Sequence, residues 1–127
     1  MAINSMFQRQ LVNVPGLTSL FGRCVGAATS NVTGLVGMGI TSIVRSGVGT
    51  HTVTLGKKYA GLLGANFAVI DTGTIDDWEV TLDTDLTSGN AFDIQVFKGG
   101  TAADLPTTAT LLFEISVQDS SVKPDGI

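Results

Sequence analysis

The chain has 127 residues, of which 43% are apolar and only 14% are charged, and its formal net charge at pH 7 is −4. This length predicts a single domain, and the low charged fraction favours a protein that hides much of its surface in an oligomer or assembly. The acidic balance argues against nucleic-acid binding. With no signal peptide and no membrane-spanning apolar stretch, we expect a soluble protein that is not exported and makes no contact with a membrane.

The charges are unevenly divided along the chain. All eleven acidic residues lie at or after Asp71, whereas five of the seven basic residues precede it. An asymmetry of this kind indicates contacts between unlike surfaces and says little about the fold. We interpret it as an interaction signal, with the basic part suited to an acidic partner.

Residues 1–39 combine an amphipathic start with a stretch rich in Gly, Ala, Ser and Thr. No period of 2 or 3.6 is sustained there, and the backbone entropy of so many glycines opposes a self-contained core. We expect an extended N-terminal arm over residues 1–39 that is ordered mainly by packing on something else. Its apolar anchors are Met6, Phe7, Leu11, Val12 and Val14, and its cations are Arg9 and Arg23.

Residues 40–118 alternate between apolar and polar side chains in several short runs. The alternation is clearest over 50–55, 78–83, 92–96 and 111–118, with weaker candidates over 40–45 and 66–71. Period-2 runs separated by Gly, Asp, Ser and Asn turns are typical of half-buried antiparallel strands. The sequence therefore predicts a mainly β protein, with a single antiparallel β-sandwich or jelly-roll-like body over 40–118. One helical turn is expected over 57–64, and residues 119–127 form a short polar tail.

Catalytic and cofactor signals are weak. His51 is the only histidine and shares a strand face with Val53 and Leu55, so we interpret it as a packed strand residue. Cys24 stands alone, which favours a small buried hydrophobe over a reactive thiol. Asp83-Thr84-Asp85 begins like a calcium loop but lacks the later ligands. We expect no enzyme activity and no cofactor.

A looser cation site remains a secondary hypothesis; its candidate ligands are Asp71, Asp76, Asp77 and Asp85. Solvated carboxylates are the simpler interpretation of these residues. Paired catalytic carboxylates, as in a small hydrolase, also stay open, although nothing in the sequence singles out a pair.

One ordered set of segments is more distinctive than any of these motifs. It comprises IVRSGVGTHTVTL (43–55), GKKY (56–59), LLGA (62–65), FDIQV (92–96), ADL (103–105), FEISV (113–117) and SSV (120–122). In this order, over about two-thirds of the chain, the segments resemble the capsid decoration or cement proteins of tailed bacteriophages, cyanophages included. His51 departs from the pattern, because an aromatic residue such as Tyr is expected there.

The resemblance implies a non-enzymatic β-sandwich on the outer surface of the phage head, assembled in the host cytoplasm, that clamps neighbouring subunits of the major capsid protein. It also implies a homo-oligomer, and we favour a trimer over a dimer because icosahedral shells offer threefold docking points. A virion-attached module that binds host carbohydrate is the alternative. Besides the arm residues, the expected contacts to the shell or to sister subunits are Arg45, Lys57 and Lys58.

Overall fold

The structure is a computed structural model that describes residues 17–118, and all the regular elements in this range are β-strands. The strands are β1 (Leu17–Val25), β2 (Thr33–Gly37), β3 (Ile40–Gly47), β4 (Thr50–Leu55), β5 (Gly61–Asp71), β6 (Trp78–Leu82), β7 (Ala91–Lys98), β8 (Thr101–Ala102) and β9 (Ala109–Gln118). Within this range no helix is present that could cross a membrane.

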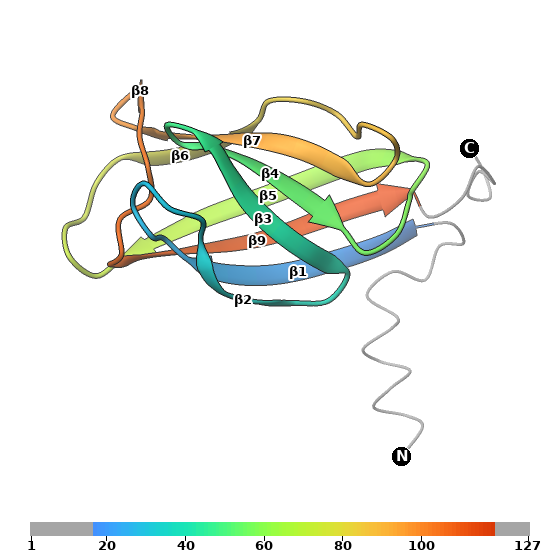
Figure 1. The fold of residues 1–127 in the computed structure, drawn as a ribbon, viewed down its shortest axis with the longest axis horizontal. Helices are drawn as coiled ribbons and strands as arrows, with labels where there is room; N and C mark the ends of the chain where they lie inside the picture. Colours follow the sequence, from blue (N-terminus) through green and yellow to red (C-terminus); the bar gives the residue numbers. More distant parts are fainter. Residues whose placement is uncertain (1–16, 119–127) are drawn as a thin grey trace, which may run out of the picture.

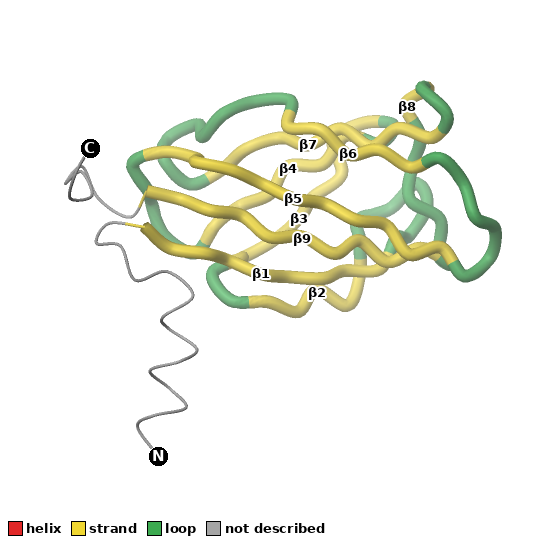
Figure 2. The backbone as a smooth tube through the Cα atoms, turned by 180° about the vertical axis from the view of Figure 1, so that it is seen from behind, coloured by secondary structure: helices red, strands yellow, loops and turns green. Residues whose placement is uncertain are grey.

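The strands form two antiparallel sheets that pack face to face, which confirms the predicted β-sandwich (Figure 1). The first sheet has the order β2-β1-β9-β5, and the second has the order β3-β4-β7-β6 with β8 attached to β7. In the reverse view the first sheet lies in front, with β5 along its upper margin and β2 along its lower one (Figure 2). Leu17 pairs with Gln118, so the two ends of the described chain lie together at one end of the sandwich.

The core lies between the two sheets because alternate residues of the inner strands point inward. On β9, residues 109, 111, 113, 115 and 117 are all buried, and the residues between them are half-buried. Strands β4 and β7 show the same alternation. The fully buried large side chains include Phe92, Leu55 and Ile94 from the second sheet and Ile115 and Leu111 from the first.

The boundary predicted at residue 39 is wrong, since β1 and β2 belong to the sandwich. Strand β1 pairs with β9 over its whole length, and Leu20 and Cys24 on β1 are 4% and 0% exposed. The alternation was hidden because an inward position of β1 is Gly22, where an added Cβ would meet the ring of Phe113 at 2.4 Å. The Phe113 ring thus occupies the space that a side chain at residue 22 would need.

The helical turn predicted over 57–64 is also wrong. The chain forms no helix between residues 17 and 118, and β5 begins at Gly61. The helical spacing of Tyr59, Leu62 and Leu63 does not reflect a shared face. Tyr59 is buried in the loop before β5, whereas Leu63 lies at an irregularity of the β5–β9 register and is 55% exposed. Residues 1–16 and the tail predicted over 119–127 lie outside the described range.

Candidate functional site

The outer face of the first sheet carries an apolar band that crosses all four strands. Arg23 on β1 pairs with Val36 on β2 and with Leu112 on β9, and Leu112 in turn pairs with Ala68 on β5. Because paired residues point to the same side of a sheet, these side chains form one row. The neighbouring rows add Phe21, Val25 and Ile70 to the band.

Several members of this band are strongly exposed. Val36 is 65% exposed, Ile70 is 47% exposed and Phe21 is 44% exposed. A shallow hollow of about 360 Å³ lies within the band, lined by Phe21, Ala68 and Leu112 together with Asn66 and Glu114. A contiguous exposed apolar surface of this kind is typical of a contact surface for another macromolecule.

The outer face of the second sheet has a different character. Thr52 donates a hydrogen bond to Asp93 across β4 and β7 at 2.6 Å, and Thr50 donates one to Gln95 at 2.6 Å. These polar cross-strand pairs satisfy one another and suit a face that is covered by water. The two outer faces therefore differ. The first carries an apolar band that is interspersed with polar residues such as Thr110 and Glu114, and the second is held by polar pairs.

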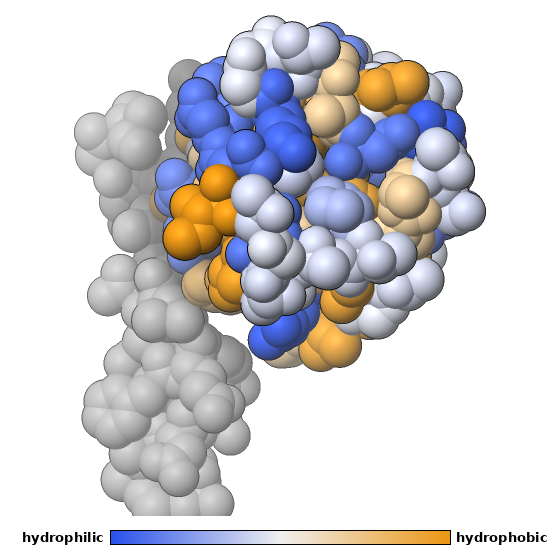
Figure 3. All heavy atoms as spheres, turned by 90° about the vertical axis from the view of Figure 1, so that its left-hand side faces the viewer, coloured by the Kyte–Doolittle hydropathy of each residue, from blue (hydrophilic) through white to orange (hydrophobic). Residues whose placement is uncertain are grey.

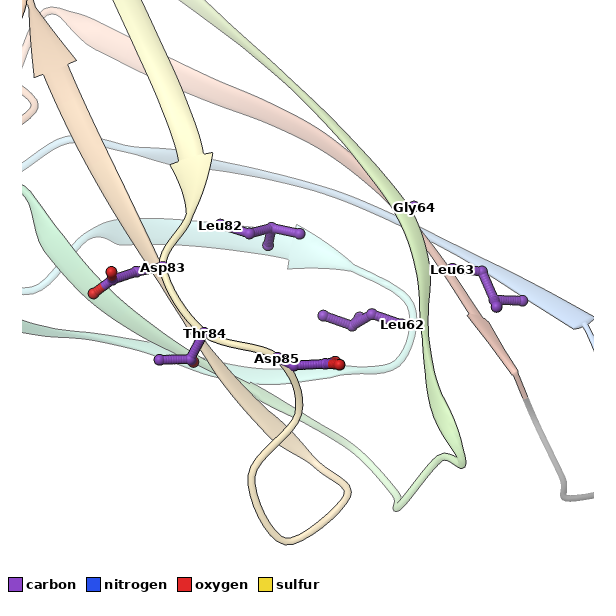
Figure 4. A pocket seen from close by; sticks show the side chains of 7 residues that line it. All are labelled: Leu62, Leu63, Gly64, Leu82, Asp83, Thr84 and Asp85. Carbon is purple, nitrogen blue, oxygen red and sulfur yellow. The ribbon is translucent and has the colours of Figure 1, made fainter.

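A second hollow, of about 390 Å³, lies between the edges of the two sheets. It is bounded by residues 62–64 of β5 and by residues 82–85 at the end of β6. Leu62 and Leu82 point toward each other across it, whereas Leu63 and Asp83 point away (Figure 4). The hollow is open and mainly apolar, and it has no polar group suited to chemistry other than the carboxylates and hydroxyl of Asp83–Asp85.

The clearest polar cluster joins β3 to the loop between β8 and β9. The Arg45 guanidinium donates from Nε and Nη2 to the two oxygens of Asp104, at 2.8 and 3.0 Å. The same carboxylate accepts a hydrogen bond from the Gly49 backbone at 2.8 Å. The hydrogen bonds from Arg45 hold the pKa of Asp104 below its ordinary value. This cluster ties the loop to the β3–β4 turn and contains no nucleophile, so its geometry is structural.

His51 lies inside the core, as its place on the strand predicted. It is 2% exposed, and its Nδ1 is buried without a hydrogen-bond partner in the described chain. Burial lowers the pKa of His51, an effect that a backbone hydrogen bond at Gly49 and the charge of Asp104 partly oppose. Its imidazole is therefore neutral in the folded protein at pH 7 and has no access to a substrate.

The burial of His51 predicts that the folded protein loses stability in mild acid. A free histidine has a pKa of about 6.5, so below that pH the unfolded chain binds a proton that the folded chain excludes. The free energy of unfolding should be constant above pH ~6.5 and should fall below it by up to ~1.4 kcal/mol per pH unit, until the depressed pKa of the folded state is reached. Urea unfolding between pH 7.5 and 5 measures this slope. Since the chain has a single histidine, His51→Leu should flatten it, and an unchanged slope in that variant would assign it to other groups.

The residues expected to contact the shell do not form one surface in the described part of the chain. Met6, Phe7, Arg9, Leu11, Val12 and Val14 all lie outside the described range. Arg23 is exposed within the apolar band. Arg45, with 21% of its side chain exposed, is engaged by Asp104, so it does not present a free charge to a partner.

Lys57 and Lys58 lie in the exposed loop between β4 and β5, and the Lys57 ammonium lies 5.3 Å from the ring centre of Tyr59. This loop follows the end of β4 that pairs with Ile40, whereas Arg45 pairs with His51 near the other end. At ~3.3 Å per strand residue, Arg45 and the two lysines are ~15–20 Å apart along the sandwich. They do not form the single basic face expected from the sequence.

The end of the sandwich that is remote from the described termini carries mostly polar loops. Viewed from this end, hydrophilic and weakly polar surface predominates, and apolar atoms form separate groups (Figure 3). Asp71 accepts hydrogen bonds from Gly73 and Thr108, and Asp76 pairs with Lys98 at 3.0 Å. Over residues 17–118, no three His, Cys, Asp or Glu side chains gather as a metal site.

The apolar band is the feature that the sequence reasoning missed. Its members come from β1, β2, β5 and β9, and two of these strands lie in the segment interpreted as an arm. Phe21 and Val25 flank Arg23 at period 2, which was a detectable signal, but Leu20 and Cys24 on the other face obscured it.

No family model, curated protein or solved structure matches this chain.

Proposed function

We propose that the protein is a non-enzymatic structural component of a tailed-phage virion, which binds the outer surface of the head and clamps neighbouring subunits of the major capsid protein. One observation carries the proposal: an apolar band lies on the outer face of the β2-β1-β9-β5 sheet, whereas the outer face of the other sheet carries cross-strand polar pairs. A protein that lies on a shell needs one surface for docking and another for solvent. The resemblance of segments within residues 40–122 to cement proteins supports the major capsid protein as the proposed partner.

The docking surface in this proposal is the apolar band with Arg23 at its centre. Arg23 lies between Val36 and Leu112, so its guanidinium supplies a charge contact surrounded by apolar area. Interfaces of this composition combine an apolar centre with arginine. Residues 1–16 lead into β1, a strand of the same sheet, and their apolar side chains and Arg9 supply further contacts to the shell or to sister subunits.

When one oligomer binds the shell through several copies, the first contact raises the effective concentration for the others. Each single contact can therefore be weak. A homotrimer would suit threefold docking points on a shell, and a dimer would suit twofold points. The free protein is assembled in the host cytoplasm and is then carried on the virion.

The alternative, a carbohydrate-binding module, has less support. Such modules present exposed aromatic rings to sugars, but Tyr59 is 9% exposed and Trp78 packs against the core. The exposed aromatic of the band, Phe21, has no hydrogen-bonding group for a sugar hydroxyl.

Deletion of residues 1–15 tests the proposal. Since β1 begins at Leu17 and the core cluster known for residues 17–118 is built from both sheets, we expect a folded protein that no longer decorates expanded heads. Circular dichroism and thermal unfolding check the fold, and co-sedimentation with undecorated heads measures occupancy. Full occupancy by the truncated chain would contradict the role assigned to this segment.

A further inference from the structure

Within residues 17–118, the end strands of the two sheet orders are β2, β5, β3 and β6, and three of these four are protected against pairing with another chain. Strand β2 has five residues and contains Gly34 at a φ of +60°. Strand β6 also has five residues and carries Glu79. Strand β3 has register irregularities at both ends, and its Arg45 backbone N–H donates to the Asn31 side chain at 2.9 Å. Short length, charge and irregularity are the usual means of blocking edge-to-edge association.

Strand β5 lacks two of these protections, because it is long and carries no charge before Asp71. It spans eleven residues, and its first ten, GLLGANFAVI (61–70), contain no charged residue and no proline. Its only irregularity is a register shift between Leu62 and Gly64. A long, uncharged and proline-free edge strand is a ready template for another strand.

The backbone groups that face outward on β5 follow from the ladder. Gly26 donates to the carbonyl of Ala109, so Ala109 faces β1. Because successive residues of a central strand face alternate neighbours, Thr110, Leu112 and Glu114 face β5. Their partners are Ile70, Ala68 and Asn66.

The intervening residues of β5 therefore direct their N–H and C=O groups away from β9. These residues are Ala65, Phe67 and Val69. No hydrogen bond within residues 17–118 uses these outward groups. Their side chains point toward the core, so a strand added at this edge would leave the sandwich packing unchanged.

We propose that β5 pairs antiparallel with β5 of a second copy of this chain about a twofold axis. The pairing joins two four-stranded sheets into one continuous sheet of eight strands. The register centred on Phe67 uses all three outward residues, because Phe67 then pairs with Phe67 of the partner subunit and Ala65 pairs with Val69 of the partner subunit. This register keeps the irregularity at residues 62–64 at the margin of the contact.

A second copy fits this edge because the strand is self-complementary. In a twofold interface both subunits contribute the same surface patch. A charge near the axis would therefore lie close to the same charge of the partner subunit. The ten-residue run has none, and Asp71 would face Leu63 of the partner subunit. Side-by-side pairing also leaves both apolar bands exposed on one common surface. The inference does not depend on the proposed function, although such a surface would double the docking area.

Removal of one outward donor tests the pairing. Ala65→Pro deletes an N–H that the intrachain ladder does not use, and proline is tolerated at such edge positions. We expect the parent chain to be a dimer at ~100 µM, consistent with a dissociation constant in the micromolar range. Ala65→Pro should be monomeric by sedimentation velocity and should keep its cooperative thermal unfolding. A monomeric parent chain at this concentration, or a folded Ala65→Pro variant that remains a dimer, would overturn the proposal.

A charge at the same edge is the second test, and it changes no backbone group. Ala68 is exposed on β5, so Ala68→Lys should give a monomer, whereas the control Thr54→Lys, on the polar outer face of β4, should remain a dimer. The double variant Asn66→Cys, Ala68→Cys should form a covalent dimer on mild oxidation, since the proposed register places residue 66 opposite residue 68 of the partner. Cys24 does not interfere because burial raises the pKa of its thiol to about 11. A double variant that stays monomeric on reducing-agent-free gels would exclude this register, and with it the proposed pairing.

Discussion

Replacement of Gly49 by alanine should lower the free energy of unfolding by about 3 kcal/mol. Gly49 has a φ of +68°, where an L side chain is strained. An added Cβ would also lie 2.6 Å from the backbone oxygens of Ala103 and Val96. To relieve this contact the backbone must shift, and the hydrogen bonds of Gly49 to Asp104 and Val96 would weaken. Urea unfolding at pH 7.5 measures the loss.

Alanine substitutions at two other glycines distinguish backbone strain from steric clash. Gly99→Ala tests strain alone, because Gly99 has a φ of +59° and open space around its Cβ position; we expect a cost of ~1 kcal/mol. Gly47→Ala tests neither, since its added Cβ meets only Thr50 at 3.8 Å and its φ is not positive; the change should be below ~1 kcal/mol. Equal effects at Gly49 and Gly99 would show that the contacts with Ala103 and Val96 do not matter.

The double variant Phe21→Asp, Val36→Asp should weaken binding to undecorated heads about 100-fold. Both side chains lie in the apolar band. An aspartate at residue 36 would lie opposite Arg23 and would compete with the shell for its guanidinium, and an aspartate at residue 21 would be desolvated against the shell. Since the residues are 44% and 65% exposed, the free sandwich should remain folded. Co-sedimentation with heads over a range of protein concentrations measures the change.

A matched control lies on the opposite sheet. Val44 on β3 is 45% exposed on the outer face of the second sheet, and Val44→Asp introduces one such charge at a similar exposure. We expect its binding to equal that of the parent chain. A loss of about 10-fold from Val44→Asp, half of the double variant's loss in free energy, would show that binding follows net charge and does not use the apolar band.

The strand pattern could be predicted from the sequence wherever one face of a strand is apolar and the other polar. Strands β4, β7 and β9 have this form, and each is recognised within a few residues of its observed bounds. Strand β1 was missed because it is apolar on both faces, with Leu20 and Cys24 inside and Phe21 outside, and because Gly22 interrupts the inner row. Alternation identifies a strand with one buried face, whereas β1 is central in a sheet whose outer face is also apolar.

The candidate surface was less accessible to prediction. Arg23 was selected for its charge, and it does lie in the apolar band, but the band itself depends on the pairing of β1, β2, β5 and β9. Arg45 was selected for the same reason, and the structure pairs it with Asp104, a residue 59 positions away. The uneven division of charge along the chain therefore does not become two charged faces, because folding brings residues from both parts together.

Electron microscopy of expanded heads of the phage whose genome encodes this chain tests the central claim most directly. Undecorated heads incubated with the purified protein should gain ordered density on their outer surface, with the β2-β1-β9-β5 sheet facing the shell and the threonine-rich sheet facing solvent. Heads that gain no density at saturating protein, or density that places the polar sheet against the shell, would contradict the account.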